Sequence, residues 1–510
     1  MKKKRWKILE DFPTKRQIYN WVGESVPVKY TKVKAGTRII DQGERVTGRH
    51  LAMLTAMKKE LNEIRKLWEP LPIVSSLIIA AIILIFSALY FKVNQPEIIQ
   101  SLQKLSLLVS IVIATFIFAK IVEWILLRNN AKLMESLHYP LIIPFATLLT
   151  CILLGSRVSL YTSAFLAIIL SAALAVEHLR FLVLNIIAAI VVILSTQSLS
   201  KRKEIFWVCG KVYLSILPLL FAFSFSANSF WNFTLAHDLV IELVFMMAIA
   251  ILVVGLLPVL ETSFKMMTEM SLMELMDPNS ELLRRMTLEI PGTYQHSLLL
   301  GSLAESMANA IHADGLFCRA ATLYHDIGKL NNPLFFTENQ QSGIDIHGLL
   351  SPAESAEVII AHVKDGVELA RKYHLPESFI DIIQQHHGTT LAYFFYRKEL
   401  DLRGGDLKAV EEEKFRYPGP KPHSKESTII MIADTVEAAS RSLENVDEEV
   451  LTELVHRMVK EREDDKQFEE SDLTFEELGI VKGVLIKTLV LARHIRIKYP
   501  ERLPTKIYSK

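Results

Sequence analysis

Apolar residues follow two different patterns in this chain, and each pattern predicts a different kind of helix. Between residues 71 and 260 they form long, nearly uninterrupted stretches, and a helix needs about 20 such residues to cross the hydrocarbon layer of a membrane. Seven stretches meet this requirement, namely 72–92, 105–127, 138–155, 158–176, 181–199, 205–227 and 237–260. The stretch 138–155 is the weakest of them, because it is short and contains Pro140 and Pro144.

After about Leu272 the apolar residues recur every three or four positions, which is typical of helices that bury one face. No run of alternating apolar and polar residues indicates a strand. The charged segment 401–424 contains Pro and Gly and predicts a loop, and amphipathic helices are expected near 447–463 and 473–498. The predicted fold class is therefore all-α, with a polytopic seven-helix membrane domain followed by an all-helical cytoplasmic domain.

Charge is distributed in the same way. The chain has 510 residues, 50% of them hydrophobic, and only 18 of its 113 Asp, Glu, Lys and Arg residues lie between 71 and 260. This composition excludes an ordinary soluble enzyme and a mostly disordered chain. We expect three parts, 1–70, a membrane domain at 71–260 and a water-exposed domain at 261–510. The net charge of +1 gives no reason to expect a nucleic-acid polymer as partner, and the three cysteines cannot form a disulfide scaffold.

The basic tripeptide Lys201-Arg202-Lys203 orients the predicted spans, because loops rich in Lys and Arg stay on the cytoplasmic side. Counting from this loop, the C-terminal half lies in the cytoplasm and the loop 228–236, which has no Lys or Arg, lies outside. Seven spans then place the first 70 residues outside. The basic start at residues 1–5 opposes this placement, and a true start further upstream, with one more span, would remove the conflict.

Histidine placement is the strongest chemical signal. Nine of the fifteen histidines lie between positions 296 and 423. Imidazole and carboxylate together suit divalent metals, and a helical bundle can supply such ligands from several helices. Adjacent His325 and Asp326 on a helix would point about 100° apart, which would let the carboxylate bridge two ions. The ordered set of candidate ligands is His296, His325, Asp326, His362, His386, His387 and Asp434, whereas His312, His347, His374 and His423 are interpreted as packed or surface residues.

In these motifs the chain resembles the HD-domain metal-dependent phosphohydrolases, whose central motif is His-Asp-Ile-Gly-Lys, here at 325–329. More narrowly, it is similar to the seven-transmembrane HD phosphodiesterases of the PgpH type, which hydrolyse cyclic di-AMP. The resemblance covers the spans and the whole C-terminal half. It is carried by four segments, 288–297, 325–329, 415–422 and 434–441.

The resemblance implies a membrane-anchored enzyme of the bacterial inner membrane that opens a cyclic dinucleotide, cyclic di-AMP above all, to a linear dinucleotide. Its partners would be this substrate and the lipid bilayer, and a homo-oligomer is left open. Asp326 and Lys329 would be catalytic, with Lys329 stabilising phosphate charge one turn beyond the His-Asp pair. Lys329, Arg441 and Tyr294 would contact the substrate.

The family pattern also implies two divalent ions, with Mn or Fe favoured. Two ions about 3.5–4 Å apart lower the pKa of a shared water and stabilise the attacking and leaving oxygens. Asp326 would bridge the two ions. The first ion would be held by His296, His325, Asp326 and Asp434, and the second by Asp326, His362, His386 and His387.

The N-terminal part departs from the family. Segment 33–57 resembles only the tail of the family's extracytoplasmic domain, so residues 1–70 are interpreted as a remnant of that domain. Its bulk and the membrane helix expected before it are missing from this sequence. Either the sensor has been lost in this lineage, or the start given is internal to a longer gene. A role in sensing an external ligand is therefore not carried over.

Several alternative functions remain. A cyclic di-GMP hydrolase of the HD-GYP kind is disfavoured, because Gly388-Thr389-Thr390 follows His387 where that group has an acidic residue, and no Gly-Tyr-Pro follows. A membrane receptor or regulator whose HD domain binds nucleotide without turnover is opposed by the intact ligand set. A transporter with a regulatory domain is opposed by spans that few Gly or Pro residues interrupt. An HD hydrolase of another nucleotide, such as guanosine tetraphosphate, stays open.

Overall fold

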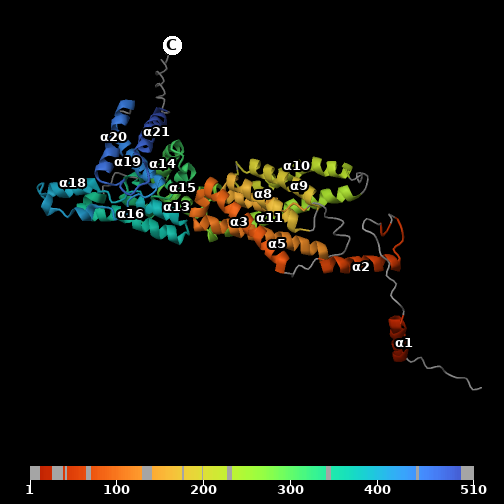
Figure 1. The fold of residues 1–510 in the computed structure, drawn as a ribbon. Coiled ribbons are helices and arrows are strands. Elements are labelled where there is room, and N and C mark those ends of the chain that lie inside the picture. The colour runs from red at the N-terminus through yellow and green to blue at the C-terminus, as the bar shows by residue number, and fades with distance from the viewer. Residues whose placement is uncertain are drawn as a thin grey trace, which may run out of the picture. The chain divides into compact units, whose positions relative to one another are not determined.

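The computed structural model describes most of the chain as helices and their connections (Figure 1). The basic residues 1–5, residues 33–37 of the family-like segment and the beginning of the predicted span 138–155 lie outside the described residues. The described ranges are 12–25, 38–40, 43–64, 70–128, 140–174, 177–197, 199–226, 233–340, 346–443 and 447–494.

The chain divides into two compact units, 1–96 and 97–510. The first unit contains α1 (Phe12–Ser25), α2 (Gly48–Ile64) and α3 (Pro70–Asn94), and α4 (Pro96–Gln100) begins at the boundary. The second unit contains the other apolar helices and the whole soluble half. The three-part division at 70 and 260 stays a prediction.

Among the described residues, six helices are long and apolar enough to cross a membrane. Each corresponds to one of the predicted stretches. They have 18 to 31 residues, which is close to or above the length needed to cross the hydrocarbon layer. Besides α3, they are α5 (Leu102–Arg128), α8 (Ser156–Ala173), α9 (His178–Ser195), α10 (Glu204–Ser226) and α11 (Phe233–Ser263).

The seventh stretch, 138–155, forms a shorter helix than predicted. Helix α7 (Ile143–Leu154) has 12 residues, which corresponds to about 18 Å and is less than the ~30 Å of a hydrocarbon layer. Pro144 is tolerated only because it lies in the first turn, and Gly155 ends the helix with a φ of 93°. Nine of the twelve side chains are buried, so α7 lies inside the bundle, against α5, α8, α9 and α11.

A buried asparagine explains how α7 can begin inside an apolar bundle. Asn185 of α9 is 1% exposed, and its Oδ1 accepts hydrogen bonds from the amides of Ile142 and Ile143, both at 3.0 Å. Its Nδ2 donates to the carbonyl of Pro140 at 3.1 Å. Unpaired backbone groups are costly where water is excluded. Asn185 therefore supplies an acceptor for amides at the start of α7, which have no partner within the helix.

The membrane helices connect to the soluble half through a cluster of four side chains, which we call the junction cluster: Arg202, Glu261, Thr268 and Glu274. Arg202 Nη2 lies 2.9 Å from Glu261 Oε2 at the end of α11, and its Nε lies 2.7 Å from Glu274 Oε1 on α12 (Glu269–Leu275). Thr268 caps α12 and also donates a hydrogen bond to Glu261. The cluster therefore ties the α9–α10 connection, the end of α11 and the first soluble helix together.

The soluble half is helical, as predicted. Among the described residues, the pair Leu391 and Arg416 forms an isolated bridge, and no strand is present. The predicted helices near 447–463 and 473–498 correspond to α20 (Glu448–Asp464) and α21 (Phe475–His494). The predicted loop 401–424 contains the short 3₁₀ turns η5 (Leu407–Ala409) and η6 (Glu412–Phe415).

Helix α14 (Pro291–Ala310) is the centre of this half and packs against α15 (Gly315–Thr322), α19 (Lys425–Ser440) and α21. Helix α16 (Pro352–Lys372) begins at Ser351, which forms a reciprocal cap with Glu354. The remaining elements are α13 (Glu281–Glu289), α17 (Glu377–Gln385), α18 (Tyr393–Leu402), η1 (Ile327–Leu330), η2 (Pro333–Phe335), η3 (Thr337–Asn339) and η4 (Ile346–Leu349).

Candidate metal centre

The structure brings all seven predicted ligands into one cluster, although they come from five separate segments. Six of them are buried and His387 is half-buried. In chain order, they are His296 on α14, His325 and Asp326 between α15 and η1, His362 on α16, His386 and His387 at the C-terminal end of α17, and Asp434 on α19.

The expectation that His325 and Asp326 share an α-helix is wrong. Helix α15 ends at Thr322, and the pair lies in the turn that precedes η1. The physical reason is the close approach of this turn to α16. A Cβ atom on Gly328 would lie 1.8 Å from the carbonyl oxygen of His362. Glycine at this position of the motif therefore allows the turn to press against α16, which brings Asp326 to His362.

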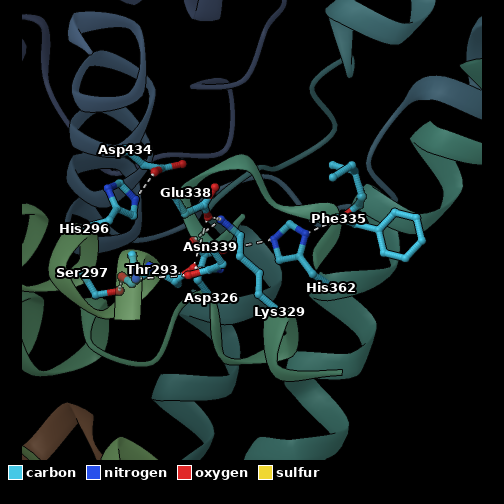
Figure 2. Close-up of polar contacts among 12 residues, drawn as sticks. Thr293, His296, Ser297, Asp326, Lys329, Phe335, Glu338, Asn339, His362 and Asp434 are labelled. Carbon is cyan, nitrogen blue, oxygen red and sulfur yellow. Dashed lines mark hydrogen bonds and ion pairs between the residues drawn. The ribbon is translucent and has the colours of Figure 1, made fainter. Parts of the chain in front are cut away.

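One group of ligand atoms belongs to His296, His325 and Asp326, and these atoms all lie within 4.8 Å of one another. Asp434 borders the group. Its Oδ1 lies 3.0 Å from His296 Nε2 and 3.9 Å from His325 Nε2, and Figure 2 shows Asp434 and His296 facing each other.

A second group of ligand atoms belongs to Asp326, His362, His386 and His387, again within 4.8 Å of one another. Asp326 Oδ1 lies 3.3 Å from His362 Nε2 and 3.7 Å from His386 Nε2. His387 Nδ1 lies 3.8 Å from Asp434 Oδ2. Asp326 is common to both groups, which is the position that a bridging carboxylate needs.

Buried atoms without a hydrogen-bond partner fit a cation at this point. His325 Nε2 and Asp326 Oδ1 are buried and make no hydrogen bond. The opposite ring nitrogens are engaged, because the Nδ1 atoms of His325, His362 and His386 lie 2.7, 2.5 and 2.8 Å from backbone carbonyls. An Nδ1–H that donates to a carbonyl leaves the Nε2 lone pair free for a metal. The residues present therefore fit a divalent cation.

The electrostatics give His362, His386, His387 and Asp326 the charge states of metal ligands. Burial lowers the pKa of His386 to about 3 and also lowers the pKa values of His362 and His387. These imidazoles are neutral at pH 7. Burial alone would raise the pKa of Asp326, but a neighbouring imidazole and Lys329 hold it well below its usual range. The bridging carboxylate is therefore ionised.

Glu437 belongs to the site, although the sequence analysis missed it. Its Oε2 lies 2.7 Å from His296 Nδ1, and its Oε1 accepts a hydrogen bond from Arg441 Nε at 2.8 Å. Burial alone would lower the pKa of His296, but Asp434 and Glu437 together raise it to about 9. The signal was present in the sequence, because a spacing of three residues places Glu437 on the same face of α19 as Asp434.

We expect Glu437→Gln to weaken metal binding about 10–100-fold, because carboxylates behind histidine ligands orient the ring and increase its basicity. Glutamine keeps the size and loses the charge. Isothermal titration of the full chain with Mn²⁺ measures the effect, and Glu453→Gln, at an exposed position of α20, is the control. Equal affinity in the two variants would show that Glu437 has no such role.

Lys329 is held by two carboxylates. Its Nζ lies 2.7 Å from Asp326 Oδ2 and 2.8 Å from Glu338 Oε1 (Figure 2). The same nitrogen lies 4.9 Å from the ring centre of Phe336. Burial alone would lower the pKa of Lys329, but these carboxylates raise it. Lys329 therefore stays charged, and it fixes the orientation of Asp326.

Glu338 and Asn339 on η3 were also missed, because they lie in no motif. Asn339 Oδ1 accepts hydrogen bonds from the amides of Gly292 and Thr293 at 3.1 and 3.2 Å, which caps α14. A Cβ atom on Gly292 would lie 2.0 Å from the carbonyl oxygen of Glu338. The Pro-Gly start of α14 thus lets η3 approach and deliver Glu338 to Lys329.

The remaining predicted substrate contacts lie in different surroundings. Tyr294 is 8% exposed and belongs to the apolar core of the soluble half, and its contact with the substrate stays a prediction. Arg441 is partly exposed and paired with Glu437. The ring of Tyr417 lies 4.3 Å from that of His387, centre to centre, and covers one side of the second ligand group.

Two family models match the chain. Residues 70–268 match the model described as a 7TM receptor with intracellular HD hydrolase, and residues 293–439 match the HD domain. The chain is 45% identical over 254 residues to a protein of Bacillus subtilis named cyclic-di-AMP phosphodiesterase PgpH. It is 43% identical over 251 residues to a protein of the same name from Listeria monocytogenes.

These matches cover part of each protein. They span 50% and 49% of this chain, but only 35% and 34% of the two curated relatives. The crystal structure of the L. monocytogenes PgpH HD domain in complex with cyclic di-AMP is 42% identical, with a TM-score of 0.41 over 42% of this chain and 99% of that one.

Proposed function

We propose that this chain, which combines the membrane domain and the HD domain of the seven-transmembrane HD family, is a membrane-anchored, metal-dependent phosphodiesterase that opens a cyclic dinucleotide to a linear one. The observation that carries the proposal is the buried cluster of five imidazoles and two carboxylates centred on Asp326. Such a cluster without a catalytic cation would be costly to bury, whereas around divalent cations it becomes a hydrolytic site.

Cyclic di-AMP is the proposed substrate. Two relatives that are 45% and 43% identical to the aligned halves of this chain bear that substrate in their names. The segments that carried the family resemblance also lie at the site, since 288–297 contains His296 and 434–441 contains Asp434 and Glu437.

We propose that the site holds two divalent ions, Mn or Fe, one in each ligand group, with Asp326 between them. Bound there, the ions would supply a water of lowered pKa and stabilise charge on the reacting oxygens. The protein's own residues have supporting tasks. Lys329 holds the Asp326 carboxylate, and Glu437 orients His296.

We propose that the chain lies in the bacterial inner membrane and that its HD half is on the cytoplasmic side. The basic loop that contains Arg202 supports this orientation, and Arg202 pairs with Glu274 of the soluble half. Reporter fusions in the 228–236 loop and after the last residue test it. The loop reporter should be active outside and the C-terminal one inside, and the reverse pattern would contradict the orientation.

The function is tested with the full chain in lipid nanodiscs, supplied with Mn²⁺ or Fe²⁺ and offered cyclic di-AMP, cyclic di-GMP or guanosine tetraphosphate. Cyclic di-AMP should be consumed fastest, with a linear dinucleotide as the product. Binding of cyclic di-AMP without turnover in either metal would instead favour a nucleotide-binding regulator. Faster turnover of another substrate would favour a hydrolase of that nucleotide.

A further inference from the structure

The two cations that the sequence suggested for substrate binding are already paired with carboxylates of the protein. Lys329 lies between Asp326 and Glu338, at 2.7 and 2.8 Å. Arg441 is paired at 2.8 Å with Glu437, which is buried and also contacts His296. The charge of each cation is therefore already balanced by a carboxylate at contact distance. Both are therefore better explained as positioning residues for metal ligands.

Arg462 on the last turn of α20 is in a different situation. Its Nε donates a hydrogen bond at 3.2 Å to Thr435 Oγ1, and Thr435 follows the ligand Asp434 on α19. Its two terminal nitrogens have no hydrogen-bond or ion-pair partner in the part of the chain that the structure describes. The guanidinium is therefore anchored on one edge and has its other edge available.

The positive charge of Arg462 is only partly balanced by the carboxylates around it. Burial lowers the pKa of its guanidinium, although Asp434, Asp465 and Glu461 act in the opposite direction. Two of these carboxylates have other partners. Asp434 accepts a hydrogen bond from His296, and Asp465 pairs with Arg416 at 3.1 Å. A partly buried cation whose neighbouring carboxylates are engaged elsewhere is stabilised by an anionic ligand.

The segment after α20 attaches the end of this helix to residues that neighbour the second ligand group. Gln467 is fully buried, and its Oε1 accepts a hydrogen bond from the amide of Thr389 at 2.9 Å. Asp465 holds Arg416, which precedes Tyr417, the residue whose ring covers His387. The residues that follow α20 are thus bound to Thr389 and to Arg416. These contacts, together with the hydrogen bond to Thr435, fix the position of Arg462.

We propose that Arg462 binds a phosphate group of the substrate through its two terminal nitrogens. This inference rests on the proposed phosphodiesterase function. A guanidinium presents parallel N–H groups that match two phosphate oxygens, which gives both charge and orientation. Arg462 would thereby hold the phosphodiester beside Asp434, while Lys329 and Arg441 keep their roles in positioning the ligands.

The test uses the full chain in nanodiscs and the variants Arg462→Ala and Arg462→Lys, with Arg457→Ala as the matched control. Arg457 lies on the same helix, is exposed and makes no ion pair among the described residues. We expect Arg462→Ala to lower kcat/KM for cyclic di-AMP about 100-fold, with metal content and melting temperature unchanged. Lysine should restore part of the loss, and added guanidinium ion should partly rescue the alanine variant but not change the control.

A generic phosphodiester, bis(p-nitrophenyl) phosphate, separates this inference from the proposed function. If the wild type cleaves this compound but no cyclic dinucleotide, the proposed substrate is wrong, and the effect of Arg462→Ala on the generic rate still decides the role of Arg462. Rates for Arg462→Ala within about threefold of wild type on the cleaved substrate would overturn the inference. So would a loss of rate that is matched by a loss of bound metal.

Discussion

Replacing Asp326 with alanine is expected to abolish hydrolysis almost completely. Its Oδ1 lies 3.3 Å from His362 Nε2, its Oδ2 lies 3.2 Å from His325 Nε2, and it belongs to both groups of ligand atoms. Removing it would weaken both cation sites at once and leave Lys329 paired with Glu338 alone. Loss of about 4 kcal/mol of charge stabilisation corresponds to a ~1000-fold lower rate.

The measurement is kcat for cyclic di-AMP, together with the metal content of the purified full chain. Asp381→Ala, at an exposed position of α17, is the matched control and should behave like wild type. Asp326→Asn keeps the shape of the side chain without its charge, and it should lose most of the activity while remaining folded by circular dichroism. A near-normal rate in either Asp326 variant would exclude a bridging role for this carboxylate.

Removing the divalent ions with a chelator is expected to abolish turnover and to lower the melting temperature of the full chain. The candidate ligands come from five segments, so ions bound to them link α14, α16, α17 and α19 and the turn before η1. A ligand that binds only the folded state at 100 times its Kd contributes about 2.7 kcal/mol. For a domain of this size that corresponds to a shift of about 5–10 °C.

Scanning fluorimetry and the hydrolysis assay, each before and after chelation, measure these effects. Mn²⁺ or Fe²⁺ should restore both the rate and the melting temperature. The Asp326→Ala protein serves as the control, because its melting temperature should respond little to chelator or metal. Full activity in the presence of excess chelator would rule out a metal-dependent mechanism.

The helical fold was predictable, because long apolar runs and three-to-four spacing report directly on burial. The weakness of the stretch 138–155 as a span was also predictable, but the way its helix α7 begins inside the bundle was not. It depends on Asn185, which is more than 40 residues away and caps the helix only in the folded bundle. The placement of His325 and Asp326 in a turn depends likewise on the contact between Gly328 and the backbone of α16. The pattern of apolar and polar residues near each position reveals neither of these two contacts.

The candidate site divides in the same way. Side chains that match a motif, such as His296 and Asp434, could be selected from sequence because the chemistry requires their types. Glu338 and Arg462 have ordinary residue types in unremarkable surroundings, and only tertiary contacts bring them to Lys329 and Thr435. Tyr294 shows that a residue within a motif can also pack in the apolar core, which its residue type and position in the motif do not reveal.

The junction cluster limits how freely the two halves could be exchanged with those of other proteins. A soluble half that is cut after Thr268 loses the cap of α12 and leaves Glu274 without Arg202. The effect would not stop there, because the carbonyl of Leu275 at the end of α12 accepts a hydrogen bond from Tyr324, the residue before His325. A chimera with the membrane part of another protein would therefore need an arginine at the position equivalent to Arg202, where it can pair with Glu274. The soluble half is therefore expected to remain stable in a chimera only when the junction cluster is kept with it.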